Sequence, residues 1–366
     1  MKKWLTLLLA IIMTFAACAA ACAEESEPVH IEILVGADST GFYEAAIAQF
    51  EEQNPGIKVD INYIPGNTDD IKKALLTAMI AEDTNPDVFL TDVVWTGQFA
   101  SAGWLKDLTG AFDDSVHGAG ALESCMYDGK YYAMPVYTDI QLLIYRKDII
   151  SEDELPKTWD EMNALCEKYV GQNGIKYGWL WQGAQAECVV CNAVSFLGSN
   201  GAGFIENGEI VCNSPAAVEA VQYMYDTVYK YNVAPEDVLS YKPADCTPIF
   251  EQGVALFDIG WPGNYASMLV DDTSTVKDVV GITVMPVGAS GTQPASCTGG
   301  WNVAVSAFTD QEEAAMKFAQ FMAGSECQAL RTKMTGCLPT IMALYDDEEL
   351  LESVSYLSDV KECVAY

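Results

Sequence analysis

The sequence predicts an α/β fold that is divided into two lobes around a central cleft. The chain has 366 residues, of which 50% are hydrophobic, so it is long enough for two domains and can fill a core in each. From residue 30 onward, segments with the period of a strand alternate with segments with the period of a helix, which is typical of mainly parallel sheets covered by helices. In 131–148, polar side chains lie between two extended apolar segments, and this pattern indicates a crossing between lobes.

The N-terminal part has the order strand, helix, strand, helix, strand. A turn at Asn54, Pro55 and Gly56 ends the first helix. Because ligands bind beyond the carboxyl ends of parallel strands, we expect the loops after these strands to face the cleft. The strands are expected at 30–35, 57–63 and 87–90, and the helices at 42–54 and 69–81.

The rest of the chain continues the mixture of helices and strands. Thr158 and Glu161 have the spacing of a capping box, so a helix is expected to begin directly after Thr158, and another is expected to begin at Pro248. The second and third crossings are expected at 281–287 and 336–340. Helices are expected at 159–170, 185–197, 215–231 and 311–323, and strands at 177–182, 254–259, 281–287 and 303–306.

The first crossing carries the ring of Tyr137 and the carboxylate of Asp139. At the floor of a cleft, these groups would suit a neutral ligand that is rich in hydroxyls. The alternative is a buried Tyr–Asp pair that satisfies its own hydrogen bonds at a turn. The run 140–145 that follows is apolar and is expected to be a buried strand.

Asp92 and Trp95 come just past the third expected strand. A carboxylate accepts hydrogen bonds from hydroxyls and an indole stacks on the apolar C–H face of a pyranose, so this pair suits a sugar. The alternative is Asp92 as a helix cap and Trp95 as a core residue. Trp261 follows another expected strand, and the adjacent Gly260 and Pro262 would fix its indole as a stacking platform.

Two further segments bring candidate groups toward the cleft. Gln182 ends the expected aromatic strand at 177–182. Gly300 and Trp301 come directly before the strand at 303–306, where the glycine lets a ligand approach the backbone closely. Several tryptophans near one cleft favour a saccharide over an amino acid or a metal ion as the ligand.

The composition excludes several classes of function. The formal net charge is −33 and the isoelectric point is about 4.1, so the surface repels phosphate backbones and a nucleic-acid partner is not expected. The only histidines are His30 and His117, and Cys188-x-x-Cys191 is the only close cysteine pair, which argues against a zinc site and any other metal. That pair is expected to supply small core residues; redox activity is the alternative. No cofactor is expected.

Residues 1–23 have the features of an export leader. Positive charge at the start is followed by an apolar stretch over 4–17, which is too short for a stable membrane span. Lipidation of Cys18, or of Cys22, is expected to anchor the exported protein to the outer face of the cytoplasmic membrane. The alternative is ordinary cleavage at 21–23, which would leave a periplasmic protein.

Taken together, these segments resemble the extracellular solute-binding proteins of carbohydrate ABC importers (family 1), and are most similar to the trehalose/maltose-binding branch. The resemblance spans roughly Ile31 to Glu349, and PKTWDEM at 156–162 is common to the wider family. The narrower motifs are DVVW at 92–95, PVYTD at 135–139, WQG at 181–183, WPG at 261–263 and GGW at 299–301.

The resemblance implies a periplasmic-binding-protein-like fold of type II. Two α/β lobes would enclose a sugar between them and be joined by three crossings. The implied lobe 1 consists of 29–138 and 284–323, and lobe 2 of 139–283 and 324–366. Related proteins continue beyond the equivalent of Tyr366 into an Arg-Pro element and further helices, so lobe 2 is expected to lack these.

The resemblance also implies a set of sugar-contacting positions. In two places the chain departs from the family: Thr40 or Gly41 stands where relatives can have an acidic residue, and Gly263 stands where an aromatic residue is usual. Trp95 and Gln182 are neighbours that we add to the set. The family's contact positions correspond to Asp92, Tyr137, Asp139, Trp261, Gly300 and Trp301.

The function that the resemblance implies is that of a receptor and not of an enzyme. The protein would capture an α-glucoside disaccharide of the trehalose or maltose type and deliver it to the permease of an ABC transporter, acting as a monomer. One alternative is a surface interaction protein without sugar affinity. Another is a glycosidase, which would need two carboxylates facing one glycosidic bond.

Overall fold

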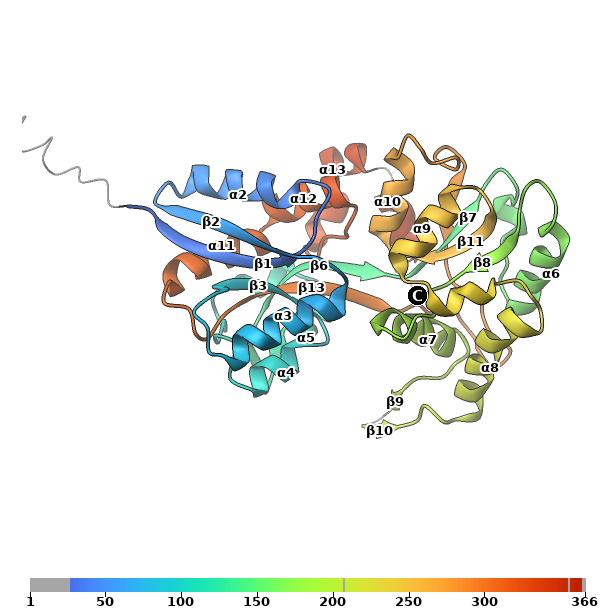
Figure 1. Cartoon of the computed structure of the whole chain (residues 1–366), viewed down its shortest axis with the longest axis horizontal. Coiled ribbons are helices and arrows are strands. Elements are labelled where there is room, and N and C mark those ends of the chain that lie inside the picture. The colour runs from blue at the N-terminus through green and yellow to red at the C-terminus, as the bar shows by residue number, and fades with distance from the viewer. Residues whose placement is uncertain (1–26, 207, 355, 364–366) are drawn as a thin grey trace, which may run out of the picture.

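The computed structural model describes residues 27–206, 208–354 and 356–363. They form two lobes that lie side by side, each built around its own sheet (Figure 1). The sheet of the first lobe has five strands in the order β2-β1-β3-β13-β6, and that of the second has four in the order β12-β7-β11-β8. The predicted α/β class with two lobes is therefore confirmed. The leader and the two cysteines expected to be lipidated, Cys18 and Cys22, lie outside the described residues.

The first sheet combines parallel and antiparallel pairs. Strand β1 is parallel to β2 and β3, whereas β13 is antiparallel to both β3 and β6. The strands are β1 Val29–Gly36, β2 Ile57–Ile64, β3 Val88–Asp92, β6 Met134–Ile140 and β13 Thr298–Val305. The helices of this lobe are α2 Phe42–Gln53, α3 Thr68–Ile80, α4 Thr96–Ser101, α5 Ala119–Ser124, α11 Glu312–Ala323 and α12 Ser325–Thr335.

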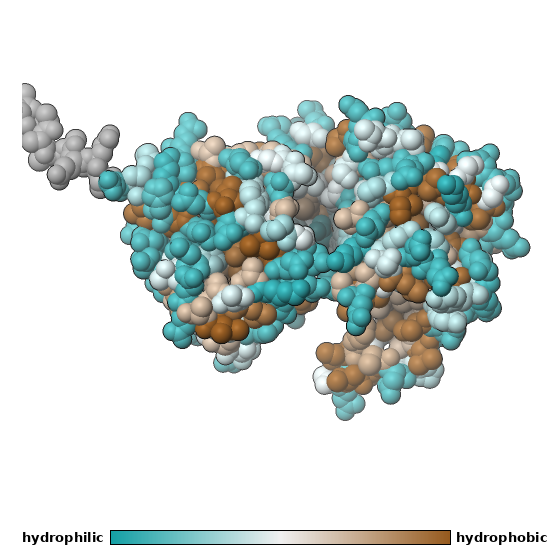
Figure 2. Space-filling view, viewed as in Figure 1, coloured by the Kyte–Doolittle hydropathy of each residue, from teal (hydrophilic) through white to brown (hydrophobic). Residues whose placement is uncertain are grey.

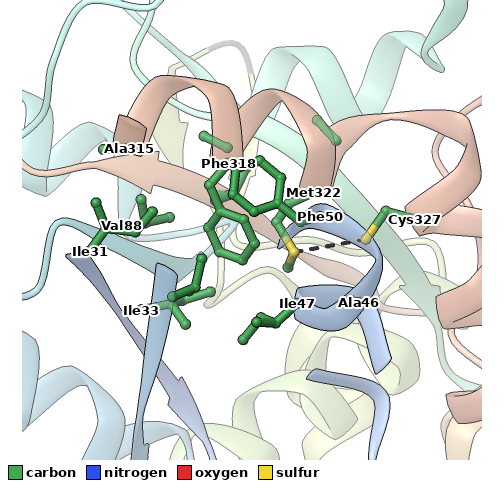
Figure 3. Packing of buried hydrophobic residues seen from close by; sticks show 14 of the residues in the cluster. Ile31, Ile33, Ala46, Ile47, Phe50, Val88, Ala315, Phe318, Met322 and Cys327 are labelled. Carbon is green, nitrogen blue, oxygen red and sulfur yellow. Dashed lines mark hydrogen bonds between the residues drawn. The ribbon is translucent and has the colours of Figure 1, made fainter. Parts of the chain in front are cut away.

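Alternation along the strands of this sheet supplies two core layers, because successive side chains point to opposite faces. On one face, Ile31 and Ile33 pack against α2 and α11 (Figure 3). The rings of Phe50 and Phe318, one from each helix, meet edge to face with centroids 4.9 Å apart. On the other face, Leu34 packs with residues of α3 and α4. Both faces of the sheet are covered by packed side chains, so residues at its edge are held on a well-packed support.

The second sheet is also mixed, with β11 parallel to β8 and antiparallel to β7. The hairpin of β9 (Ile205–Glu206) and β10 (Glu209–Ile210) projects from this lobe (Figure 1). The strands are β7 Leu142–Arg146, β8 Tyr177–Leu180, β11 Ala255–Gly260 and β12 Val280–Thr283. The helices are α6 Trp159–Tyr169, α7 Glu187–Ser199, α8 Pro215–Tyr229, α9 Pro243–Glu251, α10 Pro262–Val270, α13 Glu348–Ser353 and α14 Leu357–Cys363.

The chain passes between the two sheets at neighbouring points. Strand β6 leads into β7 through Gln141, whose N–H donates to the carbonyl of Cys297 (2.9 Å) on the segment that joins β12 to β13. Thr138 and Leu338 form a bridge that brings the segment after α12 to the same place. Figure 1 shows β6 and β13 extending from the first lobe toward the second. These segments are the connections about which the lobes could rotate.

The boundaries differ from the predictions in a few places. Strand β13 begins at Thr298 rather than 303, because the glycines that suggested a loop are held in the ladder against β6. Helix α9 begins at Pro243, with Pro248 inside it. Helix α12, which the expected division assigned to lobe 2, packs its Cys327 into the core beside α2 and α11. The predicted capping box of Thr158 and Glu161 is confirmed, because the Glu161 N–H donates a 3.2 Å hydrogen bond to the Thr158 hydroxyl.

Gly300 is a position where the pairing of β13 with β6 leaves no room for a side chain. Its φ is +142°, and a Cβ added there would lie 2.5 Å from the carbonyl oxygen of Tyr137 on β6. We expect Gly300→Ala to lower the free energy of unfolding by about 2 kcal/mol or more, because the neighbouring backbone must move. Urea unfolding measures this. Gly56→Ala is the matched control, since a Cβ there meets nothing within 4 Å. Equal stability of the two variants would contradict the expectation.

Candidate ligand-binding site

A cleft of about 530 Å³ separates the two lobes, and the surface between them is recessed (Figure 2). The first lobe supplies the ends of β3, β6 and β13, and the second supplies α7 and the start of α10. The polar and aromatic residues that line the cleft include Asp92, Asp139, Glu187, Trp261, Asn264 and Trp301, and Gly300 also lines it.

Strand register explains how residues far apart in the sequence meet here. Trp301 of β13 lies opposite Asp92 of β3 on one side and opposite Tyr137 of β6 on the other. Two residues before Trp301 on β13, Gly299 lies opposite Asp139. Tyr137 and Asp139 are two positions apart on one strand and therefore project from the same face. The sheet edge thus gathers two rings and two carboxylates.

Two indole rings stand on opposite walls of the cleft. Trp261 precedes α10, and its backbone N–H donates to the Asn264 side chain (3.0 Å). A Cβ added at Gly299 would lie 3.4 Å from the six-membered ring of Trp261, so this ring packs against the crossing strand. Trp301 is supported from behind by Trp95, whose ring meets it edge to face at 5.3 Å. Both cleft tryptophans are therefore held in place before any ligand binds.

The two aspartates of the cleft are poorly solvated. Burial raises the pKa of Asp92 to about 7, although the Val94 N–H, which donates to its Oδ1 (3.1 Å), acts in the opposite direction. Burial likewise raises the pKa of Asp139 to about 8, against the pull of the positive charge on Arg331. The Oδ1 atom of Asp139 has no hydrogen-bond partner and is shielded from solvent. Such carboxyls have unused capacity to bind hydroxyl groups.

Three of the predicted site residues lie away from the open cleft. Trp95 is only 3% exposed and sits in the core against Phe99 and Trp301, as the alternative interpretation had it. Gln182 is 1% exposed, and its side chain bonds to Asn192 and to the carbonyl of Ile259. Its amide is satisfied by protein groups, so it supports the cleft wall from within.

Tyr137, the third of these residues, lines an inner pocket of about 230 Å³ that adjoins the cleft. The two spaces share Trp301 and Cys337. Asp38 lines this pocket beside Thr40, and accepts hydrogen bonds from the Thr40 N–H (2.9 Å) and the Phe42 N–H (2.9 Å). Asp38 thus places a carboxylate beside Thr40 at this pocket.

Other lining residues had no sequence signal. Tyr43 belongs to the helix expected at 42–54 and Arg331 to α12, which was not predicted, and both border the inner pocket. Glu187 lies at the start of α7, where acidic residues are common for helix stability alone. These lining residues can be identified only when the strand order is known, because that order brings their helices beside the cleft.

Most cysteines in the described part of the chain are buried. Cys188 and Cys191 are buried on α7, and no disulfide bond joins cysteines within the described ranges. No group of three or more His, Cys, Asp or Glu side chains among the described residues is placed to hold a metal ion. In that same part of the chain, no helix has the length and apolarity that crossing a membrane requires.

The raised pKa of Asp139 has a consequence for stability. The contribution of the protonated Asp139 carboxyl to the free energy of unfolding is fully present below pH 3.8, the pKa of the unfolded state. This contribution is lost as the pH rises through the folded-state pKa of about 8. Asn cannot ionise, so we expect the melting temperature of Asp139→Asn to gain several degrees relative to wild type between pH 4 and pH 9. Thermal scans without ligand, with the exposed Glu52→Gln as control, check this. Parallel pH profiles for wild type and Asp139→Asn would contradict it.

Comparison with known proteins identifies the architecture. The family description of a bacterial extracellular solute-binding protein matches residues 36–329. The chain is 29% identical over 292 residues to a probable ABC transporter-binding protein of Deinococcus radiodurans, which covers 76% of this chain and 68% of that protein. It is 28% identical over 276 residues to a galactooligosaccharide-binding protein of Bacillus subtilis, covering 74% and 64%.

Solved structures agree with this assignment. The maltose-bound MalE3 of T. maritima superposes with a TM-score of 0.86 at 32% identity, covering 92% of this chain and 87% of that one. The GacH receptor of Streptomyces glaucescens, at 23% identity, shares the fold with a TM-score of 0.81. The predicted resemblance is confirmed: the chain belongs to the family of bacterial extracellular solute-binding proteins, which are binding receptors and not enzymes.

Proposed function

We propose that the protein captures an α-glucoside disaccharide of the trehalose or maltose type and delivers it to the permease of an ABC transporter. The observation that carries this proposal is the pairing of rings and carboxylates across one cleft. Trp261 comes from one wall, and Trp301, Asp92 and Asp139 come from the other. This combination matches a ligand that has apolar C–H faces and hydroxyl edges.

Each part of the site has a role in this proposal. The indole faces of Trp261 and Trp301 stack on the sugar rings, while Asp92 and Asp139 accept hydrogen bonds from hydroxyls. Rotation of the lobes about the crossing segments closes the second wall on the sugar and excludes water. Burial of the carboxyls makes their bonds to the sugar stronger than they would be in water.

The comparisons support a sugar as the ligand class. One structural neighbour was solved with maltose bound, and one relative is described as a galactooligosaccharide-binding protein. We propose that the mature protein is held at the outer face of the cytoplasmic membrane by a lipid on Cys18 or Cys22, which would keep it near its permease. Labelling with a radioactive fatty acid in cells, lost in the matching Cys→Ser variant, tests the anchor.

Calorimetric titration with trehalose and then maltose tests the sugar-binding proposal. We expect saturable binding by the chain without residues 1–23, and at least about tenfold weaker binding by Trp261→Ala, because a central aromatic anchor is lost. Tyr229→Ala is the control, since this ring is 45% exposed on the outer helix α8. A folded wild type that binds neither these nor other saccharides would contradict the proposal and favour an interaction protein without sugar affinity.

The pH dependence of binding tests the role of the aspartates. The pKa values of Asp92 and Asp139 are raised to about 7 and about 8, so both carboxyls hold protons at pH 6 and must lose them to act purely as acceptors. We expect affinity to rise between pH 6 and pH 9, by up to about tenfold per pH unit for each group below its pKa. Asp139→Asn should flatten the upper part of this rise. Affinity that falls with pH in wild type would contradict the assigned role.

A further inference from the structure

Arg331 of α12 is a buried cation without a charged partner. Its side chain is 4% exposed, and no ion pair found among the described residues involves it. The central guanidinium carbon lies 3.9 Å from the ring centroid of Phe42, 5.0 Å from that of Tyr137 and 5.4 Å from that of Tyr43. The Nε and Nη2 atoms have no hydrogen-bond partner and no contact with solvent. Aromatic rings and a hydrogen bond with Tyr43 therefore hold the group, but they leave these two donors unsatisfied.

An unsatisfied buried guanidinium is costly, so its position matters. Burying a charge without hydrogen bonds is strongly unfavourable, and such groups normally have paired partners. Arg331 borders the inner pocket of about 230 Å³, together with Asp38, Tyr43 and Tyr137. This pocket adjoins the main cleft at Trp301 and Cys337. Arg331 thus lies in the wall of a space that adjoins the cleft, with its two unsatisfied donors shielded while no ligand is bound.

The donors have a complement in the adjacent cleft. The Oδ1 atom of Asp139 is also buried and without a partner, and the charge of Arg331 acts on that carboxyl. One group can only donate hydrogen bonds and the other, when ionised, can only accept them. Sugar hydroxyls do both, so a sugar unit that reaches the inner pocket can satisfy the two groups together.

We infer that Arg331 is a ligand-binding residue whose Nε and Nη2 donate to two neighbouring oxygens of the sugar unit in the inner pocket. This inference rests on the proposed function. The two N–H groups lie on one edge of the planar guanidinium and point in parallel, which matches paired oxygens such as those of a carboxylate or of adjacent hydroxyls. An amino group at this place would bring a second cation beside Arg331, so the pocket selects against amino sugars.

Calorimetry on matched variants tests the inference. Arg331→Met keeps much of the side-chain length and removes all donors, and we expect it to bind the preferred saccharide about 10- to 100-fold more weakly than wild type. Lys333→Met is the control: it removes one positive charge from the same helix, but Lys333 is exposed and pairs with Glu349 outside the pocket (2.7 Å). We expect its affinity to equal that of wild type.

The ligand panel separates the two sources of paired oxygens. Trehalose and maltose offer adjacent hydroxyls, a disaccharide that carries glucuronic acid offers a carboxylate, and a glucosamine disaccharide offers an ammonium group. Tighter binding of the acidic sugar by wild type, lost in Arg331→Met, assigns a carboxylate to the pocket. Tighter binding of a neutral sugar, lost in the same variant, assigns hydroxyls. Preference for the glucosamine disaccharide would overturn the inference.

The calorimetric results distinguish failure of this inference from failure of the proposed function. If wild type binds a saccharide and a folded Arg331→Met binds it equally well, Arg331 has only a structural role and the inference fails alone. If folded wild type binds no saccharide, the proposed function fails and the inference fails with it. Should Arg331→Met not fold, Arg331→Lys keeps the cation over Phe42 while losing the parallel donors. Wild-type affinity in that folded variant would also overturn the inference.

Discussion

Strand β13 pairs antiparallel with both β3 and β6, and this pairing fixes the positions of the cleft residues. It joins the C-terminal part of the chain to the first lobe and sets Asp92, Trp301 and Tyr137 in one row. Close approach at Gly300 is a condition of this pairing, because any Cβ would meet the β6 backbone. The same strands lead toward the second lobe, so the element that builds the site also carries the connections about which the lobes would close.

The proposed sugar binding depends on buried polar groups that lack hydrogen-bond partners or are poorly solvated in the ligand-free protein. Desolvation raises the pKa values of Asp92 and Asp139, and the Nε and Nη2 donors of Arg331 have no partner. Each of these costs stability in the absence of ligand. The two well-packed cores of the first lobe, on either face of its sheet, offset that cost. A sugar that supplies the missing hydrogen bonds would recover it on binding.

The fold and part of the site could be predicted from the sequence because local patterns carry them. Strand and helix periods indicated the elements, and residues directly past strand ends, such as Asp92 and Trp261, were expected in the cleft and line it. Trp95 and Gln182 were also close to strand ends, but burial and internal contacts remove them from the cleft. Arg331 could not be found in this way, since its place depends on how α12 packs against α2 and beside β6, which no local pattern records.

A crystal structure of the protein with maltose or trehalose bound would show directly where the sugar lies. We expect electron density for the sugar between Trp261 and Trp301, with hydroxyls at hydrogen-bond distance from Asp92 and Asp139. Density for the sugar outside this cleft, or an empty cleft at a sugar concentration that saturates binding in solution, would contradict this expectation.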